Sequence, residues 1–199
     1  MRKFERITAL VLVLLLVIAT NVMDNTSFTI VKNSVSSIFD DRLVAYDLTY
    51  KMHNQIMNRQ IGLLKDDQVA FKASTAQFES SIENLIDKYA KTNLTSKEAG
   101  NFEMLQTQFE ELKDLENQYL STKDKIAGDE LHDTIETQIA QITETLNTLA
   151  AIQIKEGRRL LNDSNRAVNS SKLLSKIEII SMIIIAMIII FMIVRETRS

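Results

Sequence analysis

The chain has 199 residues, no cysteine, no proline, and 23 Lys and Arg against 26 Asp and Glu, for a net charge of −3. The lack of cysteine excludes disulfide bonds and thiol chemistry, and the balanced, mixed-sign charge pattern excludes a basic patch for nucleic acid. Without proline and with only four glycines, the chain is predicted to be all-α.

An uncharged apolar run, Ile7–Met23, opens the chain and has about the length needed to cross a hydrocarbon core of roughly 30 Å. Arg2, Lys3 and Arg6 precede it, so a cleaved secretory signal is the alternative. The apolar core is long for a signal, and Ala19–Asn21 lacks the small-x-small pattern that signal peptidase favours. We therefore predict an uncleaved membrane anchor.

Apolar residues at spacings of three and four follow this run, and they predict helices packed side by side. The first such helix extends through Leu63 and breaks near Leu64–Asp67, where Asp66 or Asp67 is a suitable N-cap for the next helix. The second helix carries its apolar seam from Phe71 to Tyr89. These two helices form half of a predicted bundle.

A third helix is marked by a capping-box pattern directly after the second helix ends at Lys91–Asn93. The Thr95 hydroxyl and the Glu98 carboxylate can each accept a hydrogen bond from a free amide at this terminus. The apolar seam of this helix runs to Tyr119. We expect the helix to stop at Gly128, in the left-handed conformation that closes helices.

Asp129 is the expected cap of the fourth helix, whose apolar residues run from Leu131 to Ile152 and continue without a breaker into a second apolar run, Ile179–Val194. This run is apolar on every face, which favours a membrane span over a buried core helix. The predicted fold is an antiparallel up-down-up-down four-helix bundle in which helices one and four are continuous with two transmembrane helices. Such continuity would transmit helix displacements to the membrane.

Basic residues flank both runs on their outer sides, and they predict that both termini are cytoplasmic and the centre is exported. Lys172 and Lys176, in contrast, fall on the exported side of the second span. The predicted segments are a cytoplasmic N-terminus (1–6), a span (7–23), a periplasmic or extracellular bundle (24–177), a second span (178–194) and a cytoplasmic tail (195–199).

The segment Val35–Leu48 has an acidic-Arg-aliphatic pattern early in the first bundle helix. With the two spans, it resembles the four-helix-bundle sensor domain of bacterial methyl-accepting chemotaxis receptors. The resemblance implies a two-pass protein of the bacterial inner membrane that forms a homodimer through its first helices. The chain ends at Arg195–Ser199, so we expect no cytoplasmic linker or signalling domain of that family.

Four residues are candidates for binding a small-molecule ligand: Arg42, Tyr46, His53 and Arg59. A guanidinium can hold an anion bidentately, with Tyr46 beside it. The ordinary alternative is that Arg42 pairs with Asp40, Asp41 or a carboxylate of another helix. With His53 and His132 as the only histidines, and no nucleophile turn or phosphate loop, we predict no metal site, cofactor or enzymatic activity.

The leading functional hypothesis is a membrane-anchored, chemoreceptor-like sensory or co-receptor protein. Its exported bundle would bind a ligand and act through helix packing on a partner, for example a full-length chemoreceptor or sensor kinase. Two alternatives stay open: a structural or scaffolding bundle without a ligand, and the remnant of a longer receptor.

Overall fold

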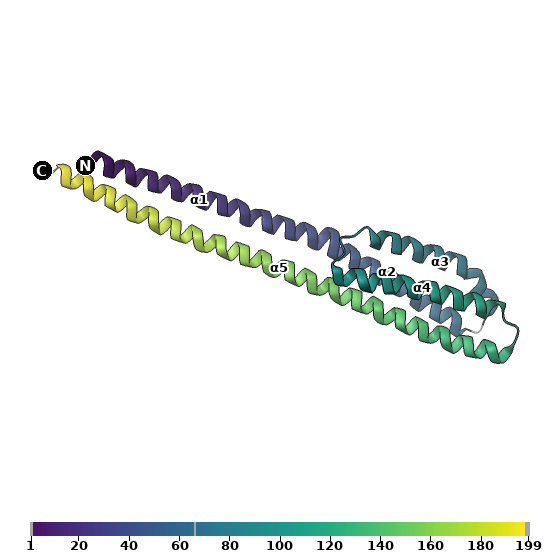
Figure 1. The fold of residues 1–199 in the computed structure, drawn as a ribbon. Helices are drawn as coiled ribbons and strands as arrows, with labels where there is room; N and C mark the ends of the chain where they lie inside the picture. Colours follow the sequence, from purple (N-terminus) through teal and green to yellow (C-terminus); the bar gives the residue numbers. More distant parts are fainter. Residues whose placement is uncertain (1, 66, 198–199) are drawn as a thin grey trace. The chain divides into compact units, whose positions relative to one another are not determined.

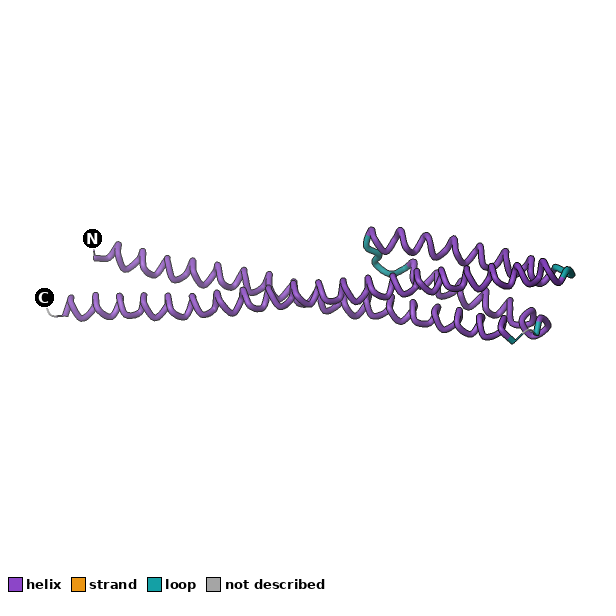
Figure 2. The backbone as a smooth tube through the Cα atoms, turned by 90° about the horizontal axis from the view of Figure 1, so that it is seen from below, coloured by secondary structure: helices purple, strands orange, loops and turns teal. Residues whose placement is uncertain are grey.

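The computed structural model describes residues 2–65 and 67–197, and all its regular elements are helices (Figure 1). Figure 2 shows that the described loops are confined to short connections between them. The helices are α1 (Arg2–Ser37), the π-helix η1 (Ile38–Leu43), α2 (Val44–Leu64), α3 (Gln68–Ala90), α4 (Ser96–Ser121) and α5 (Lys125–Thr197). The predicted all-α fold is confirmed.

The chain divides into two compact units: Ser37–Arg158, and Met1–Ser36 together with Arg159–Ser199. The first unit is the four-helix bundle and contains η1, α2, α3, α4 and the beginning of α5. This unit is shorter than the predicted range 24–177. The boundaries of the five predicted segments remain predictions.

The core of the bundle is apolar and receives side chains from all four helices, because residues three and four apart share a helix face. Leu85 and Phe78, predicted for the seam of α3, are partly buried and pack against this core. Val35, predicted for the first seam, is instead exposed. The most buried core residues include Met52, Ile56, Leu63, Tyr89, Leu105, Leu112, Ile135, Ile139, Ile142, Leu146 and Leu149.

Two helix N-termini are capped as predicted. The Asp67 carboxylate accepts hydrogen bonds from the amides of Val69 and Ala70, whereas Asp66, the alternative cap, lies outside the described residues. Thr95 and Glu98 form the complete capping box of α4. These caps satisfy amides that the first helical turn leaves without partners.

The predicted end of the third helix was wrong. The helix α4 ends at Ser121, and α5 begins at Lys125, so Gly128 lies inside the first turn of α5 and Asp129 does not cap it. Asp124 takes that role: its carboxylate accepts from the amide of Ile126, and its carbonyl accepts from the amide of Gly128. Asp124 thus caps the helix five residues before the predicted cap, Asp129, because its acidic side chain accepts from a free amide of the first turn.

A π-helical turn, η1, separates α1 from α2 where the apolar spacing predicted regular α-helix. Such turns hold one more residue per hydrogen-bonded ring and occur often at functional sites. Arg42 is the buried residue of η1. The side chain of Asp41, in the same turn, accepts hydrogen bonds from Ser37 and from Asn93.

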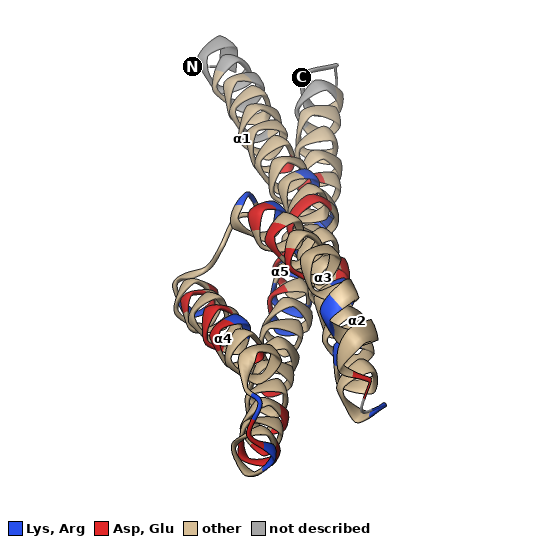
Figure 3. Ribbon diagram, turned by 90° about the vertical axis from the view of Figure 1, so that its right-hand side faces the viewer, with Lys and Arg blue, Asp and Glu red and all other residues tan. Residues whose placement is uncertain are grey.

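The second unit contains the apolar runs. Among the described residues, two helices are long and apolar enough to cross a membrane: one runs from Val11 to Leu64 through η1 and one from Lys125 to Phe191. Their apolar windows are not buried within the protein. Figure 3 shows charged residues along the bundle helices, whereas the apolar parts of α1 and α5 carry none. Within this unit, the Ser171 hydroxyl hydrogen-bonds to Asp24.

Candidate functional site: a groove above a buried polar cluster

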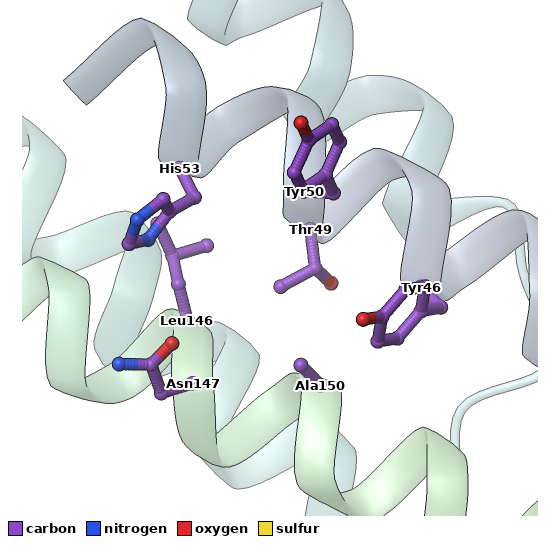
Figure 4. A pocket seen from close by; sticks show the side chains of 7 residues that line it. All are labelled: Tyr46, Thr49, Tyr50, His53, Leu146, Asn147 and Ala150. Carbon is purple, nitrogen blue, oxygen red and sulfur yellow. The ribbon is translucent and has the colours of Figure 1, made fainter. Parts of the chain in front are cut away.

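A solvent-facing cavity of about 220 Å³ lies between α2 and α5 in the bundle (Figure 4). Its lining combines aromatic rings with polar groups: Tyr46, Thr49, Tyr50 and His53 from α2, and Leu146, Asn147 and Ala150 from α5. Tyr46 and Tyr50 are 41% and 58% exposed, so the cavity offers apolar surface to a ligand or partner.

A second cavity of about 290 Å³ shares Tyr46 with the first. Its other lining residues are Ile38, Arg42, Leu43, Gln153, Ile154 and Gly157. We call the two cavities together the α2–α5 groove. The structure thus brings three of the four predicted ligand residues, Arg42, Tyr46 and His53, to one groove, and it places Arg59 elsewhere.

Arg42 is buried and pairs with a carboxylate of another helix. Its Nη1 donates to Glu98 Oε2 at 2.8 Å and to Gln153 Oε1 at 3.1 Å, and its Nη2 donates to the backbone carbonyl of Asn93. Glu98 is fully buried. Arg42 therefore joins η1 to α4, to α5 and to the loop before α4, and its ion-pair partner is Glu98 rather than Asp40 or Asp41.

Glu98 accepts several hydrogen bonds, and they control its charge. Burial by itself raises the pKa of Glu98, but hydrogen bonds with Thr95, Arg42 and Gln153 outweigh that effect and lower the pKa below its usual value. The Gln153 amide donates to Glu98 and also to the Tyr89 hydroxyl at 3.0 Å. Burial raises the pKa of Tyr89 to about 12, so this phenol stays neutral. The buried polar cluster is thus an ionised pair surrounded by neutral donors.

Arg59 lies in a separate buried cluster and uses all of its N–H donors. Its Nε and Nη2 bind the two oxygens of Glu116 at 2.8 and 2.7 Å, and the other donors reach groups on α3. Those acceptors are the Phe71 carbonyl, the Ser74 hydroxyl and the Thr75 hydroxyl. A ligand carboxylate at Arg59 would have to displace Glu116.

Aromatic rings close the Arg59 cluster. The guanidinium carbon lies 3.4 Å from the ring centroid of Phe71 and 5.2 Å from that of Phe78, both within range of a cation–π contact. Burial raises the pKa of Glu116 above its ordinary value, although Arg59 opposes this shift. Nearby Glu79 adds to the increase.

Sequence reasoning missed Glu98, Gln153 and Glu116 as members of these clusters. A signal was present, because Gln153 lies four residues after seam residue Leu149, and Glu116 lies four residues after Leu112 and three before Tyr119. Polar residues at seam positions point into the core and must find partners there.

His132, Asp133 and Glu136 offer ligand atoms within 4.8 Å of one another on α5. Asp133 is exposed and the other two are partly exposed. Exposed acidic groups commonly gather in this way without an ion, so these three side chains support no metal assignment.

The fold is that of a helical sensory module. Residues 2–168 match the family described as a four helix bundle sensory module for signal transduction. The chain belongs to this family, the sensory modules of methyl-accepting chemotaxis receptors, and the predicted resemblance is confirmed. No curated protein and no solved structure matches the chain.

Proposed function

We propose that the chain is a membrane-anchored sensory or co-receptor protein in which the α2–α5 groove recognises a small molecule or a partner. The supporting observation is that Arg42 and Gln153 line the groove and also bind the buried Glu98. A ligand that contacts either side chain competes with Glu98. Occupancy would therefore change the contacts among η1, α4 and α5.

The lining favours a small ligand that carries both an anionic group and an apolar part. The Arg42 guanidinium can receive a carboxylate, and the rings of Tyr46 and Tyr50 provide apolar surface. His53 and Asn147 add polar groups at the other end of the groove. Amino acids and organic acids meet this description.

We further propose that the signal leaves the bundle through α5, which is one helix from Lys125 to Thr197. Its apolar segment would cross the membrane, as would that of α1, with both termini cytoplasmic and the bundle exported. The partner that receives the signal would be a full-length chemoreceptor or a sensor kinase. Single cysteines replacing Lys97 and Ser199 test this topology, because an impermeant thiol reagent should label only Lys97→Cys from outside.

Homodimerisation would use the outer face of α2. Exposed apolar residues recur at heptad-like spacing along this side of the chain: Leu43 at the end of η1, and Tyr46, Tyr50, Met57, Ile61 and Leu64 in α2. A second copy of the same helix would cover this seam. Because Leu43, Tyr46 and Tyr50 also line the groove, the groove would open at the dimer interface.

The decisive experiment is a thermal unfolding screen of the full-length protein in lipid nanodiscs with amino acids and organic acids. A ligand at 100 times its dissociation constant stabilises the folded state by about 2.7 kcal/mol. Asn147→Ala and His53→Ala should remove the shift, whereas Met104→Ala, an exposed change on α4, should retain it. If no compound shifts the midpoint, and crosslinking in cells recovers no chemoreceptor or sensor kinase, a structural bundle replaces the sensory proposal.

A further inference from the structure

A cavity of about 570 Å³ lies between α1 and α5 in the unit that contains the apolar runs. Three apolar and six polar or charged residues line it: Asp24, Ser27, Phe28 and Val31 of α1, and Val168, Ser171, Lys172, Ser175 and Lys176 of α5. We propose that this cavity binds the headgroup of an anionic phospholipid. The inference rests on the proposed membrane anchoring.

On both helices, part of the cavity lies close to an apolar run. Asp24 directly follows the first apolar run, and Phe28 lies about 6 Å further along at 1.5 Å per residue. On α5, Lys176 precedes the second run at Ile179 by about 4.5 Å. The polar layer on each side of a bilayer is about 5 to 7 Å thick, so Asp24, Phe28 and Lys176, each counted along its own helix, lie at about its depth. Lys172 lies about 10.5 Å before Ile179, so only its long side chain can extend toward this layer.

The charges of the lining match one monoanionic phosphodiester. Lys172 and Lys176 provide two positive charges, and Asp24 provides one negative charge, so the lining has a net charge of +1. The Asp24 carboxylate is engaged by the Ser171 hydroxyl. Lysine is a flexible point charge that binds phosphate well, and its long stem can extend along apolar surface.

The three apolar residues of the lining favour a lipid over free phosphate. Phe28 is 69% exposed, and Val31 and Val168 line the same cavity. Inorganic phosphate gains nothing from these side chains, whereas the glycerol and upper acyl chain of a phospholipid would cover them. The hydroxyls of Ser27 and Ser175 can donate to the phosphate oxygens.

The test uses the full-length chain in detergent and measures lipid retention by native mass spectrometry during titration with phosphatidylglycerol or phosphatidylcholine. We expect preference for phosphatidylglycerol. Lys172→Gln and Lys176→Gln should each weaken that affinity about fivefold, as for a single basic residue near an anionic surface. Lys97→Gln and Lys123→Gln, at exposed positions of the bundle unit, are matched controls and should leave it unchanged.

Asp24→Asn gives a change of opposite sign, because removing the negative charge should strengthen phosphatidylglycerol binding. Equal retention by the wild type and the double lysine variant would overturn the inference, as would equal competition by inorganic phosphate. Flotation of the protein with membranes separates this failure from failure of the proposed function. A protein that does not float is not membrane-anchored, and both proposals then fall; a floating protein without lipid preference refutes only the lipid site.

Discussion

Two buried arginines link the first bundle helix to α4, and their surroundings differ. Arg42 pairs with Glu98 at 2.8 Å and lines the α2–α5 groove, whereas Arg59 pairs with Glu116 at 2.7 Å beneath two phenylalanine rings. The first pair borders a cavity that a ligand can enter. In the second pair, every N–H group of Arg59 already donates to a protein acceptor.

The two carboxylates show what this difference does to charge. At Glu98, hydrogen bonds overcome the cost of burial and the pKa falls, whereas at Glu116 burial dominates and the pKa rises. An ion pair rich in donors beside a groove can exchange partners at modest cost. An ion pair enclosed by aromatic rings cannot, so we assign sensing to the Arg42 cluster and stability to the Arg59 cluster.

The largest expected effect is at the Arg59–Glu116 pair, which aromatic rings enclose. Glu116→Ala should destabilise the bundle by about 3–5 kcal/mol, because it leaves Arg59 charged and buried without its carboxylate. Urea unfolding of the full-length protein in detergent, followed by circular dichroism, measures the change. Glu103→Ala, an exposed change on the same helix, should stay within about 0.5 kcal/mol. A loss at Glu116 no larger than this control would refute the structural role of the pair.

At the Arg42–Glu98 pair, which borders the groove, Glu98→Ala should lower the free energy of unfolding by less, about 2 kcal/mol. The change removes one half of a capping box and a charged hydrogen-bond partner, but water entering the groove can solvate Arg42. The same urea titration compares the two variants directly. If Glu98→Ala destabilises as much as Glu116→Ala, the groove does not relieve burial and the contrast between the clusters fails.

Local signals in the sequence were sufficient for most of the fold. Spacings of three and four located the bundle core, and the short-range patterns at Asp67 and Thr95 identified two caps, because a capping interaction involves residues within one turn. The same logic failed at Gly128, where Asp124 provided an earlier cap. Competing caps a few residues apart are not ranked by pattern alone.

The candidate site was less predictable, because its contacts join residues far apart in the chain. Arg42 was recognised, but its partner Glu98 is 56 residues away and Gln153 is 111 away. The π-helical turn that contains Arg42 also leaves no mark in the apolar pattern. Pairings across helices depend on the register between them, which composition and spacing do not determine.

The pH dependence of stability should separate the clusters by sign. The Glu98 pKa is lower in the folded than in the unfolded protein, so its contribution is present above the ordinary value of 4.5 and is lost as the pH falls below it. The Glu116 pKa is raised, so the folded state takes up a proton first and gains stability as the pH falls towards 4.5. Urea unfolding between pH 7 and about 3 measures both, with Glu98→Gln and Glu116→Gln each removing one slope. If the Glu98 and Glu116 contributions changed with pH in the same direction, the proposed difference between the two clusters would be wrong.

The smallest expected effect tests whether the residues of the Arg42 cluster stabilise the bundle cooperatively. Thr95→Ala should cost about 1 kcal/mol through loss of the cap, and Thr107→Ala, an exposed change in mid-α4, serves as its control. The Thr95 hydroxyl accepts from the backbone amide of Glu98 at 3.3 Å, and Nη1 of Arg42 donates to the carboxylate of Glu98 at 2.8 Å, so both side chains bind Glu98. Residues that share a partner couple by about 0.5 kcal/mol or more, so a double-mutant cycle of Thr95→Ala with Arg42→Met should show this coupling. The same cycle with Arg59→Met should be additive, because Arg59 bonds to Glu116 and not to Glu98.

Coupling in both cycles would mean that the two arginine clusters respond together. The groove could then signal through the whole bundle rather than only through the end of the bundle that contains Arg42.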